Sequence, residues 1–213
     1  MSGNCRKWKN KTLRPAFFAG FYYPLKYAKI KHMEFIKTTL KDVYLVRPKV
    51  FGDDRGFFLE SYSKKKFEEA GINVDFVQDN HSKSEKRGTL RGMHFQANPH
   101  AQAKLLRAVK GSIYDVVVDL RKDSETFGKW EGFRLTADNF QMLFVPRGFA
   151  HGFMTLEDNT EVLYKADNFY QPEAEGGIAW NDPELKIDWP IQDPTLSERD
   201  NNWPNLKKLT NLF

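Results

Sequence analysis

Short runs of apolar residues, broken by Gly, Pro, Asn and Asp, follow one another along most of the chain after Val43. The runs are rich in Val, Phe, Tyr, Leu and Thr, which favour β-strands. The pattern predicts strands at 43–50, 56–60, 89–96, 104–109, 112–120, 132–136, 141–145 and 160–169. Lys110-Gly111 separates two of these strands and indicates a hairpin turn or a bulge.

A helical pattern is convincing only in the segment that follows Tyr62. Ser63 suits the N-cap, and Phe67 and Ala70 form an apolar stripe. Gly71 is the candidate for the C-terminal cap. We therefore predict one short helix here.

The order of the predicted elements indicates the fold class. The chain lacks both the strand–helix alternation and the Gly-rich phosphate loop of dinucleotide-binding folds. Closely spaced strands with few helices are typical of a sandwich or barrel of the jelly-roll type. We predict an all-β jelly roll with a few short helices. The segment 181–213 contains four prolines, and we expect it to wrap around the barrel as loops and short helical turns.

Basic residues are concentrated at the N-terminus, so the net charge of +5 does not describe the whole chain. Residues 1–32 hold eight Lys and Arg and no Asp or Glu, which leaves a net charge of −3 for the remaining residues. Binding of nucleic acid requires a contiguous basic patch with stacking aromatics. No nucleic-acid partner is therefore expected for the domain.

Three interpretations of residues 1–32 remain open. The segment can be a targeting sequence, a basic arm that contacts nucleic acid or membrane, or a stretch that precedes a true start at Met33. The regular pattern begins abruptly at Met33, which favours the last interpretation. We expect residues 1–32 to form a disordered extension and residues 33–213 to form one domain.

Cysteine and apolar content exclude further classes. The only cysteine, Cys5, lies in the extension, so the domain has neither a disulfide framework nor a cysteine zinc site. No apolar run reaches the roughly 18 residues that span a bilayer, and no membrane partner is predicted.

Two histidines are candidates for chemistry. His94 lies in the apolar segment T-L-R-G-M-H-F-Q, where it shares a face with Gly92 and Gln96. It is either a site residue in a barrel mouth or a hydrogen-bonded core histidine. His151 lies in P-R-G-F-A-H-G-F, which indicates a glycine-flanked turn that contacts a ligand or carries an incidental histidine. The domain has no H-x-H or H-x-E pair at strand spacing, so no metal site is predicted.

Cationic and phenolic side chains accompany these histidines. Arginine matches phosphate oxygens, and a lysine in a pocket suits an anionic oxygen. The candidates are Arg55, Arg91, Lys104, Arg107 and Arg147, each of which is otherwise a solvated surface charge. Tyr164 lies in a predicted strand and is either a core residue or a general acid.

Nine segments, in order, resemble the dTDP-4-dehydrorhamnose 3,5-epimerase family over Met33–Leu209. They are F-x-D-x-R-G-F-F-x-E (51–60), V-Q-D-N-H-S (77–82), L-R-G-M-H-F-Q (90–96), A-Q-A-K-L-L-R (101–107), G-x-I-Y-D-V-V-V-D-L-R (111–121), V-P-x-G-F-A-H-G-F (145–153), Y-K-x-x-x-x-Y (164–170), D-P-x-L-x-I-D-W-P (182–190) and L-S-x-x-D (196–200). Any one of these segments is weak evidence, but nine in register are highly specific.

The resemblance implies a cytoplasmic, cofactor-free isomerase with a cupin-like jelly roll (double-stranded β-helix) that forms a homodimer. Its substrate is a dTDP-linked 4-keto-6-deoxyhexose, inverted at C3 and C5 to give dTDP-4-dehydro-L-rhamnose. The alternatives are a related mono-epimerase or keto-isomerase, and a non-catalytic jelly roll that binds a sugar nucleotide.

The resemblance also implies roles for individual residues. His94 is the base, Asp200 its partner, Lys104 the cation at the C4 oxygen and Tyr164 the proton donor on the opposite face. The substrate-binding positions are Arg55, Glu60, Asp79, Asn80, His81, Arg91, Lys104, His151, Tyr170, Glu175 and Arg199. Arg199 stands at a position that we associate with lysine in the family. In a flat pleat Arg91 and His94 point to opposite faces, so Gly92 either introduces a bulge or Arg91 lies at the strand entrance.

Overall fold

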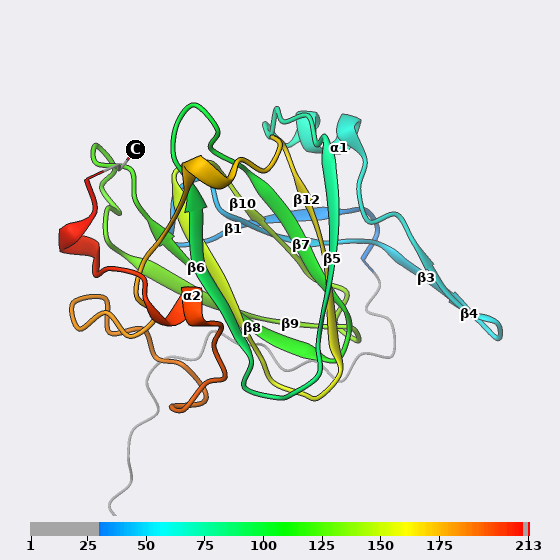
Figure 1. The fold of residues 1–213 in the computed structure, drawn as a ribbon. Helices are drawn as coiled ribbons and strands as arrows, with labels where there is room; N and C mark the ends of the chain where they lie inside the picture. The colour runs from blue at the N-terminus through cyan, green and yellow to red at the C-terminus, as the bar shows by residue number, and fades with distance from the viewer. Residues whose placement is uncertain (1–29, 211–212) are drawn as a thin grey trace, which may run out of the picture.

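Two antiparallel sheets lie face to face in the computed structural model, which describes residues 30–210 and 213 (Figure 1). The six-stranded sheet has the order β1 (Glu34–Lys37), β2 (Tyr44–Arg47), β10 (Met142–Val145), β7 (Lys104–Lys110), β12 (Thr160–Ala166) and β5 (Gln78–Ser84). The five-stranded sheet has the order β13 (Glu175–Gly177), β6 (Leu90–Gln96), β11 (Phe149–Thr155), β8 (Ser112–Asp119) and β9 (Trp130–Thr136). This arrangement confirms the predicted all-β jelly roll.

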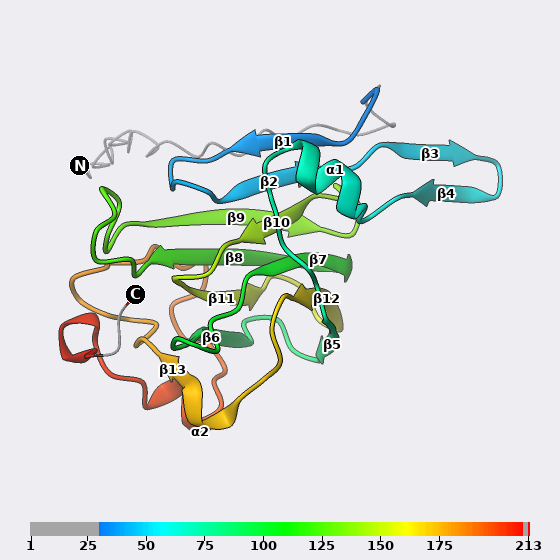
Figure 2. The same cartoon turned by 90° about the horizontal axis from the view of Figure 1, so that it is seen from above.

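A separate hairpin projects from the body of the molecule (Figure 2). It consists of β3 (Val50–Asp53) and β4 (Gly56–Leu59), which pair only with each other within the described chain. Three of its phenylalanines are exposed, Phe51 by 51%, Phe57 by 58% and Phe58 by 68%. Among the residues that the structure describes, none forms a layer that covers this apolar arm.

The predicted turn at Lys110-Gly111 is wrong as a hairpin. Strands β7 and β8 on either side of it belong to different sheets, so the chain crosses from one sheet to the other at this point. Gly111 has φ +70, and the register of β12 against β7 shifts beside Lys110, which is a bulge. The residue pattern marked the corner correctly but did not show which strands pair.

Three apolar layers hold the sheets in place. The first lies between the sheets and includes Leu106 and Val117. The second lies under helix α1 (Lys64–Glu69), whose Phe67 is completely buried. Ser63 occupies the predicted N-cap position, although its side chain makes no hydrogen bond to the helix. Gly71 follows the end of the helix with φ +83.

The third layer lies on the outer face of the five-stranded sheet, under the C-terminal tail. The tail runs as loops with α2 (Glu198–Asn201) and the short turn η2 (Leu206–Lys208), and a further turn, η1 (Pro172–Ala174), precedes β13. This arrangement confirms the prediction of a wrapping tail. Because the tail covers the sheet that carries β6, α2 comes into contact with that strand.

The basic segment 1–32 lies almost entirely outside the described residues. In the part of the chain that the structure describes, no helix has the length and apolar character needed to cross a membrane.

Candidate active site

One part of the space between the sheets is polar rather than apolar. Strand alternation places Lys104 on the same inner face of β7 as Leu106 and Ala108, which belong to the core. The same alternation directs polar side chains inward from four other strands. The inner polar cluster consists of Lys104 (β7), Asp115 (β8), His94 (β6), His151 (β11) and Tyr164 (β12). Five strands of both sheets thus converge on one set of ionisable groups.

His94 is paired with Asp200. Its Nε2 lies 2.7 Å from the Asp200 Oδ1, and the aspartate side chain is only 4% exposed. Burial alone raises the pKa of Asp200, but the hydrogen bond and charge of His94, with the Gly92 N–H, outweigh burial and lower that pKa below its usual range. An ionised carboxylate only accepts hydrogen bonds, so Nε2 carries the proton. Nδ1 is therefore the ring nitrogen of His94 that can take up a proton.

A bulge at Gly92 brings Arg91 and His94 to the same side of β6. His94 pairs with His151 and Arg91 with Phe153, so β6 uses one more residue than β11 over this stretch. A Cβ on Gly92 would lie 2.5 Å from the Gly152 Cα, and its φ is +136. Glycine is therefore required at this position. Of the two alternatives predicted for Arg91, the structure shows the bulge at Gly92. The Arg91 guanidinium donates to the Ser84 Oγ at 3.1 Å and to a β5 carbonyl.

A second histidine–carboxylate pair lies deeper in the cluster. The His151 Nε2 is 3.0 and 3.1 Å from the two carboxylate oxygens of Asp115. Burial raises the pKa of Asp115, and His151 and Lys104 oppose that rise. His151 lies in a fully buried strand, so its prediction as part of a turn was wrong. The sequence analysis did not select Asp115, although an acidic residue inside an apolar strand is a signal that it needs a buried partner.

The pKa of Lys104 lies well below that of an exposed lysine. Burial lowers its pKa to about 8, while Asp115 and then Glu175 act in the opposite direction. The ammonium is therefore present at neutral pH but is easily lost. Such a group suits an oxygen that becomes negatively charged during a reaction.

Tyr164 approaches the cluster from the sheet opposite His94, because β12 and β6 belong to different sheets. Burial raises the pKa of its phenol, and Arg91 only partly opposes this rise. The phenol therefore keeps its proton at neutral pH and can donate it. The imidazole and the phenol therefore lie on the inner faces of opposite sheets.

A set of charged groups borders the His94–Asp200 pair. The Tyr170 hydroxyl donates to the Glu175 Oε2 at 2.9 Å. The Arg199 Nη1 lies 3.0 and 2.7 Å from the two Glu175 oxygens, and its Nε lies 3.4 Å from the Asp200 Oδ1. The predicted residues Tyr170, Glu175 and Arg199 are therefore joined to one another, and they reach His94 through Asp200.

Strand β5 places its predicted residues on two different faces. Asn80 pairs in register with Tyr164 and points inward, and its Nδ2 is buried without a hydrogen-bond partner among the described residues. Asp79 and His81 point outward, with side chains 73% and 55% exposed, where they bind Lys165 and Glu161. Adjacent strand residues cannot all reach one pocket. Asp79 and His81 thus lie away from the inner polar cluster.

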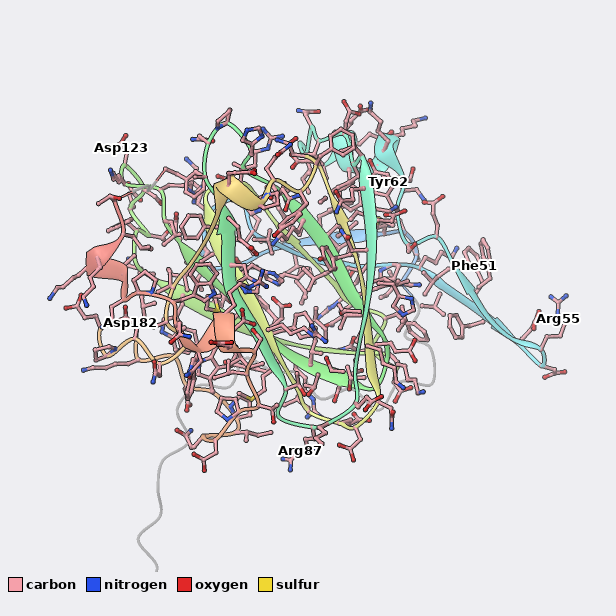
Figure 3. The ribbon with its side chains drawn as sticks, viewed as in Figure 1. Phe51, Arg55, Tyr62, Arg87, Asp123 and Asp182 are labelled. Atoms are coloured by element: carbon pink, nitrogen blue, oxygen red, sulfur yellow. The ribbon has the colours of Figure 1, made fainter. Side chains whose placement is uncertain are left out.

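Arg55 and Glu60 also lie away from the cluster. Arg55 is at the tip of the β3–β4 hairpin with its side chain 89% exposed (Figure 3). Glu60 accepts a hydrogen bond from the Lys66 ammonium at 2.6 Å. Arg147 pairs with Asp167. Arg107 lies between the inward-facing residues Leu106 and Ala108 of β7, so its side chain is on the outer face of the sheet. Within one chain these four residues do not contribute to the site.

Further inward polar atoms were missed by the sequence analysis. The Ser82 Oγ is buried without a hydrogen-bond partner among the described residues, next to Asn80 on the inner face of β5. Gln78 binds Asn80 through its side-chain nitrogen and the Tyr170 N–H through its oxygen. Among the residues that the structure describes, no three His, Cys, Asp or Glu side chains converge as metal ligands.

The sequence of this chain is similar to those of known proteins. A family model described as dTDP-4-dehydrorhamnose 3,5-epimerase matches residues 37–208. A dTDP-4-dehydrorhamnose 3,5-epimerase of Shigella flexneri is 56% identical over 171 residues, which cover 80% of this chain and 94% of that protein. The matched span 37–208 contains every residue of the inner polar cluster and Asp200.

Solved structures give the same result. The crystal structure of a dTDP-4-dehydrorhamnose 3,5-epimerase from Bacillus anthracis, with TDP and PPi bound, has a TM-score of 0.80 at 53% identity and covers 82% of this chain and 99% of that one. An epimerase from Legionella pneumophila in complex with dTDP-4-keto-L-rhamnose has a TM-score of 0.80 at 42% identity, with coverage of 84% and 95%. Both similarities extend over the whole jelly roll.

Proposed function

This chain belongs to the dTDP-4-dehydrorhamnose 3,5-epimerase family, and we propose that its inner polar cluster performs the inversion at C3 and C5. The substrate is dTDP-4-dehydro-6-deoxy-D-glucose and the product is dTDP-4-dehydro-L-rhamnose. One observation carries the proposal for the site. His94, which is paired with a buried aspartate, and Tyr164, whose phenol keeps its proton, project from opposite sheets into the space between them.

Both inverted carbons lie next to the C4 ketone, so one chemistry serves both. The His94 Nδ1 removes the proton from C3 or C5, and the electron pair moves into the carbonyl to form an enolate. The enolate then collapses as Tyr164 donates its proton to the other face of the same carbon. The phenol recovers a proton from solvent and His94 releases one before the second carbon reacts.

The cation of Lys104 stabilises the charge that develops on the C4 oxygen. Asp200 holds the imidazole in the tautomer that accepts at Nδ1 and stabilises the imidazolium once it forms. Arg91 lies on the same side of β6 as His94, where its guanidinium fits an oxygen of the substrate diphosphate.

The substrate assignment is tested by incubation with dTDP-4-dehydro-6-deoxy-D-glucose in deuterated water, followed by NMR. We expect deuterium at both C3 and C5 and the L-rhamno product. Deuterium at only one carbon would identify a mono-epimerase, and migration of the ketone would identify an isomerase. Either of these results would overturn the double inversion.

A second prediction concerns the pH dependence of kcat/KM. The Lys104 ammonium is present below its pKa of about 8 and is lost above it, so kcat/KM should fall on the alkaline side with a midpoint near that value. Asp115→Asn removes the carboxylate that favours the ammonium, and we expect it to move the midpoint to lower pH. The pH profile of each enzyme measures both effects.

Lys165→Met serves as the control for this prediction, because Lys165 lies on the outer face of β12 and binds Asp79. Its alkaline midpoint should equal that of the unaltered enzyme. A profile that stays flat well beyond pH 8 would contradict the role of Lys104.

We further propose that the β3–β4 hairpin binds a second copy of the chain in a homodimer. The arm exposes Phe51, Phe57 and Phe58, and large exposed apolar patches mark interaction sites. Arg55 at its tip would then reach the partner's pocket as an additional cation for the diphosphate. Sedimentation equilibrium should give twice the mass of one chain, and a monomeric mass would contradict the proposal.

A further inference from the structure

Asp200 reaches His94 from a distant part of the chain. It belongs to α2, a helix of only four residues in the C-terminal tail, whereas His94 lies in the middle of β6. The Ser197 Oγ accepts from the Asp200 backbone N–H at 3.1 Å, and Trp203 packs its ring edge-on at 6.0 Å from the His94 ring. The geometry of the His94–Asp200 pair therefore depends on how firmly the tail is held against the sheet.

Arg199 supplies a direct connection between the tail and the sheet. Its Nη1 binds both oxygens of Glu175, the first residue of β13, which is the strand paired with β6. Its Nε is directed at the Asp200 Oδ1, the same oxygen that accepts from His94. One guanidinium thus joins a sheet residue to the partner of the base through two separate nitrogens.

A lysine could not make the same connection, because its ammonium is a single point of charge on a flexible stem. The guanidinium is planar and rigid, so its Nη1 and Nε keep a fixed separation. The side chain is half-exposed, yet both of its partners are well buried, Glu175 at 15% and Asp200 at 4% exposure. Arg199 is the cation that contacts both of these carboxylates.

We propose that Arg199 is a positioning residue, which holds Asp200 against His94 by tying α2 to β13. The same contacts extend through Glu175 to Tyr170, so they link the outer end of the site to the base. The expected fall in kcat rests on the proposed function of His94, whereas the expected change in the His94–Asp200 hydrogen bond does not. Because Arg199 is engaged by two carboxylates, its loss should affect turnover more than substrate affinity.

The test combines kinetics with a measurement on the substrate-free enzyme. Arg199→Met and Arg199→Lys are compared with the unaltered enzyme for kcat, for KM, and for the low-field NMR signal of the His94 Nε2 proton, which His94→Gln assigns. Loss of a group that orients a metal-bound histidine typically costs roughly 10–100-fold in activity. By analogy, we expect a fall in kcat of that size for Arg199→Met. KM should change by less than about threefold, and the proton signal should broaden or disappear.

Two further variants make the result decisive. Glu175→Gln breaks the same connection from its other end, so it should weaken the proton signal in the same direction. Arg147→Met removes an arginine that pairs with Asp167 outside the site, and it should leave the signal unchanged. Arg199→Lys should fall between the unaltered enzyme and Arg199→Met.

A raised KM with unchanged kcat and an unchanged proton signal would show that Arg199 is only a substrate cation, which overturns the inference. Failure of the proposed function looks different. The unaltered enzyme would then exchange no deuterium into the sugar, while the proton signal would still respond to Arg199 if the inference is correct. The thermal unfolding midpoint of each variant verifies that the fold is retained.

Discussion

Replacing His94 with alanine should abolish the incorporation of solvent deuterium at both C3 and C5 of dTDP-4-dehydro-6-deoxy-D-glucose. A single imidazole serves both carbons, so the two exchange reactions should be lost together. General-base catalysis contributes roughly 10²–10⁴-fold, and we expect a loss at the upper end of that range because the methyl group of alanine cannot accept a proton in place of the imidazole.

The measurement is the NMR spectrum of the sugar after prolonged incubation in deuterated water. Binding of dTDP by the His94→Ala variant, followed by calorimetry, serves as the control that the site still folds. Near-normal exchange in a variant that binds dTDP would refute the assignment of His94 as the base. Loss of exchange at only one carbon would show that a different group acts on the other.

Replacing Tyr164 with phenylalanine should lower net epimerisation by roughly 10²–10⁴-fold, the usual size of a general-acid contribution. The phenol is the donor on the opposite sheet from His94, and burial keeps it protonated by raising its pKa. Proton removal does not need this hydroxyl. Exchange with solvent should therefore survive in part while inversion is lost.

The comparison of exchange with inversion in one sample separates the two roles. Tyr44→Phe is the matched control, because Tyr44 packs on the outer core under α1 and contacts the Phe144 ring at 6.5 Å. It should keep ordinary turnover. An unchanged inversion rate in Tyr164→Phe would mean that another group returns the proton.

Most strands were predictable because their residues alternate on two apolar surfaces. Strands β1, β5, β11 and β13 and most of β3 escaped prediction, and two of these strands have a clear local reason. Strand β5 reads Q-D-N-H-S-K-S, since one of its faces is exposed and the other carries the polar side of the site. Strand β11 contains Gly152 and directly follows Gly148, and two glycines this close together indicate a turn when the neighbouring strands are not known.

The residues of the site can also be divided into those that were identified from the sequence and those that were not. The resemblance selected His94, Lys104, Tyr164 and Asp200, and the structure brings the first three to facing surfaces and places Asp200 against His94. Asp115 escaped attention because its importance lies in the partners His151 and Lys104, which come from other strands. Asp79 and His81 were included because they match substrate-binding positions of the family, yet alternation turns them to the outer face.

The sequence by itself determined the fold class, the family and the identity of the chemical groups, because periodicity and ordered motifs are local properties of the chain. Only the tertiary structure decided which of those groups meet. The bulge at Gly92 brings Arg91 to the same side of β6 as His94, and the tail brings Asp200 to His94, which lies 106 residues before it in the chain. Such contacts depend on register and on the packing of distant segments, which no local pattern encodes.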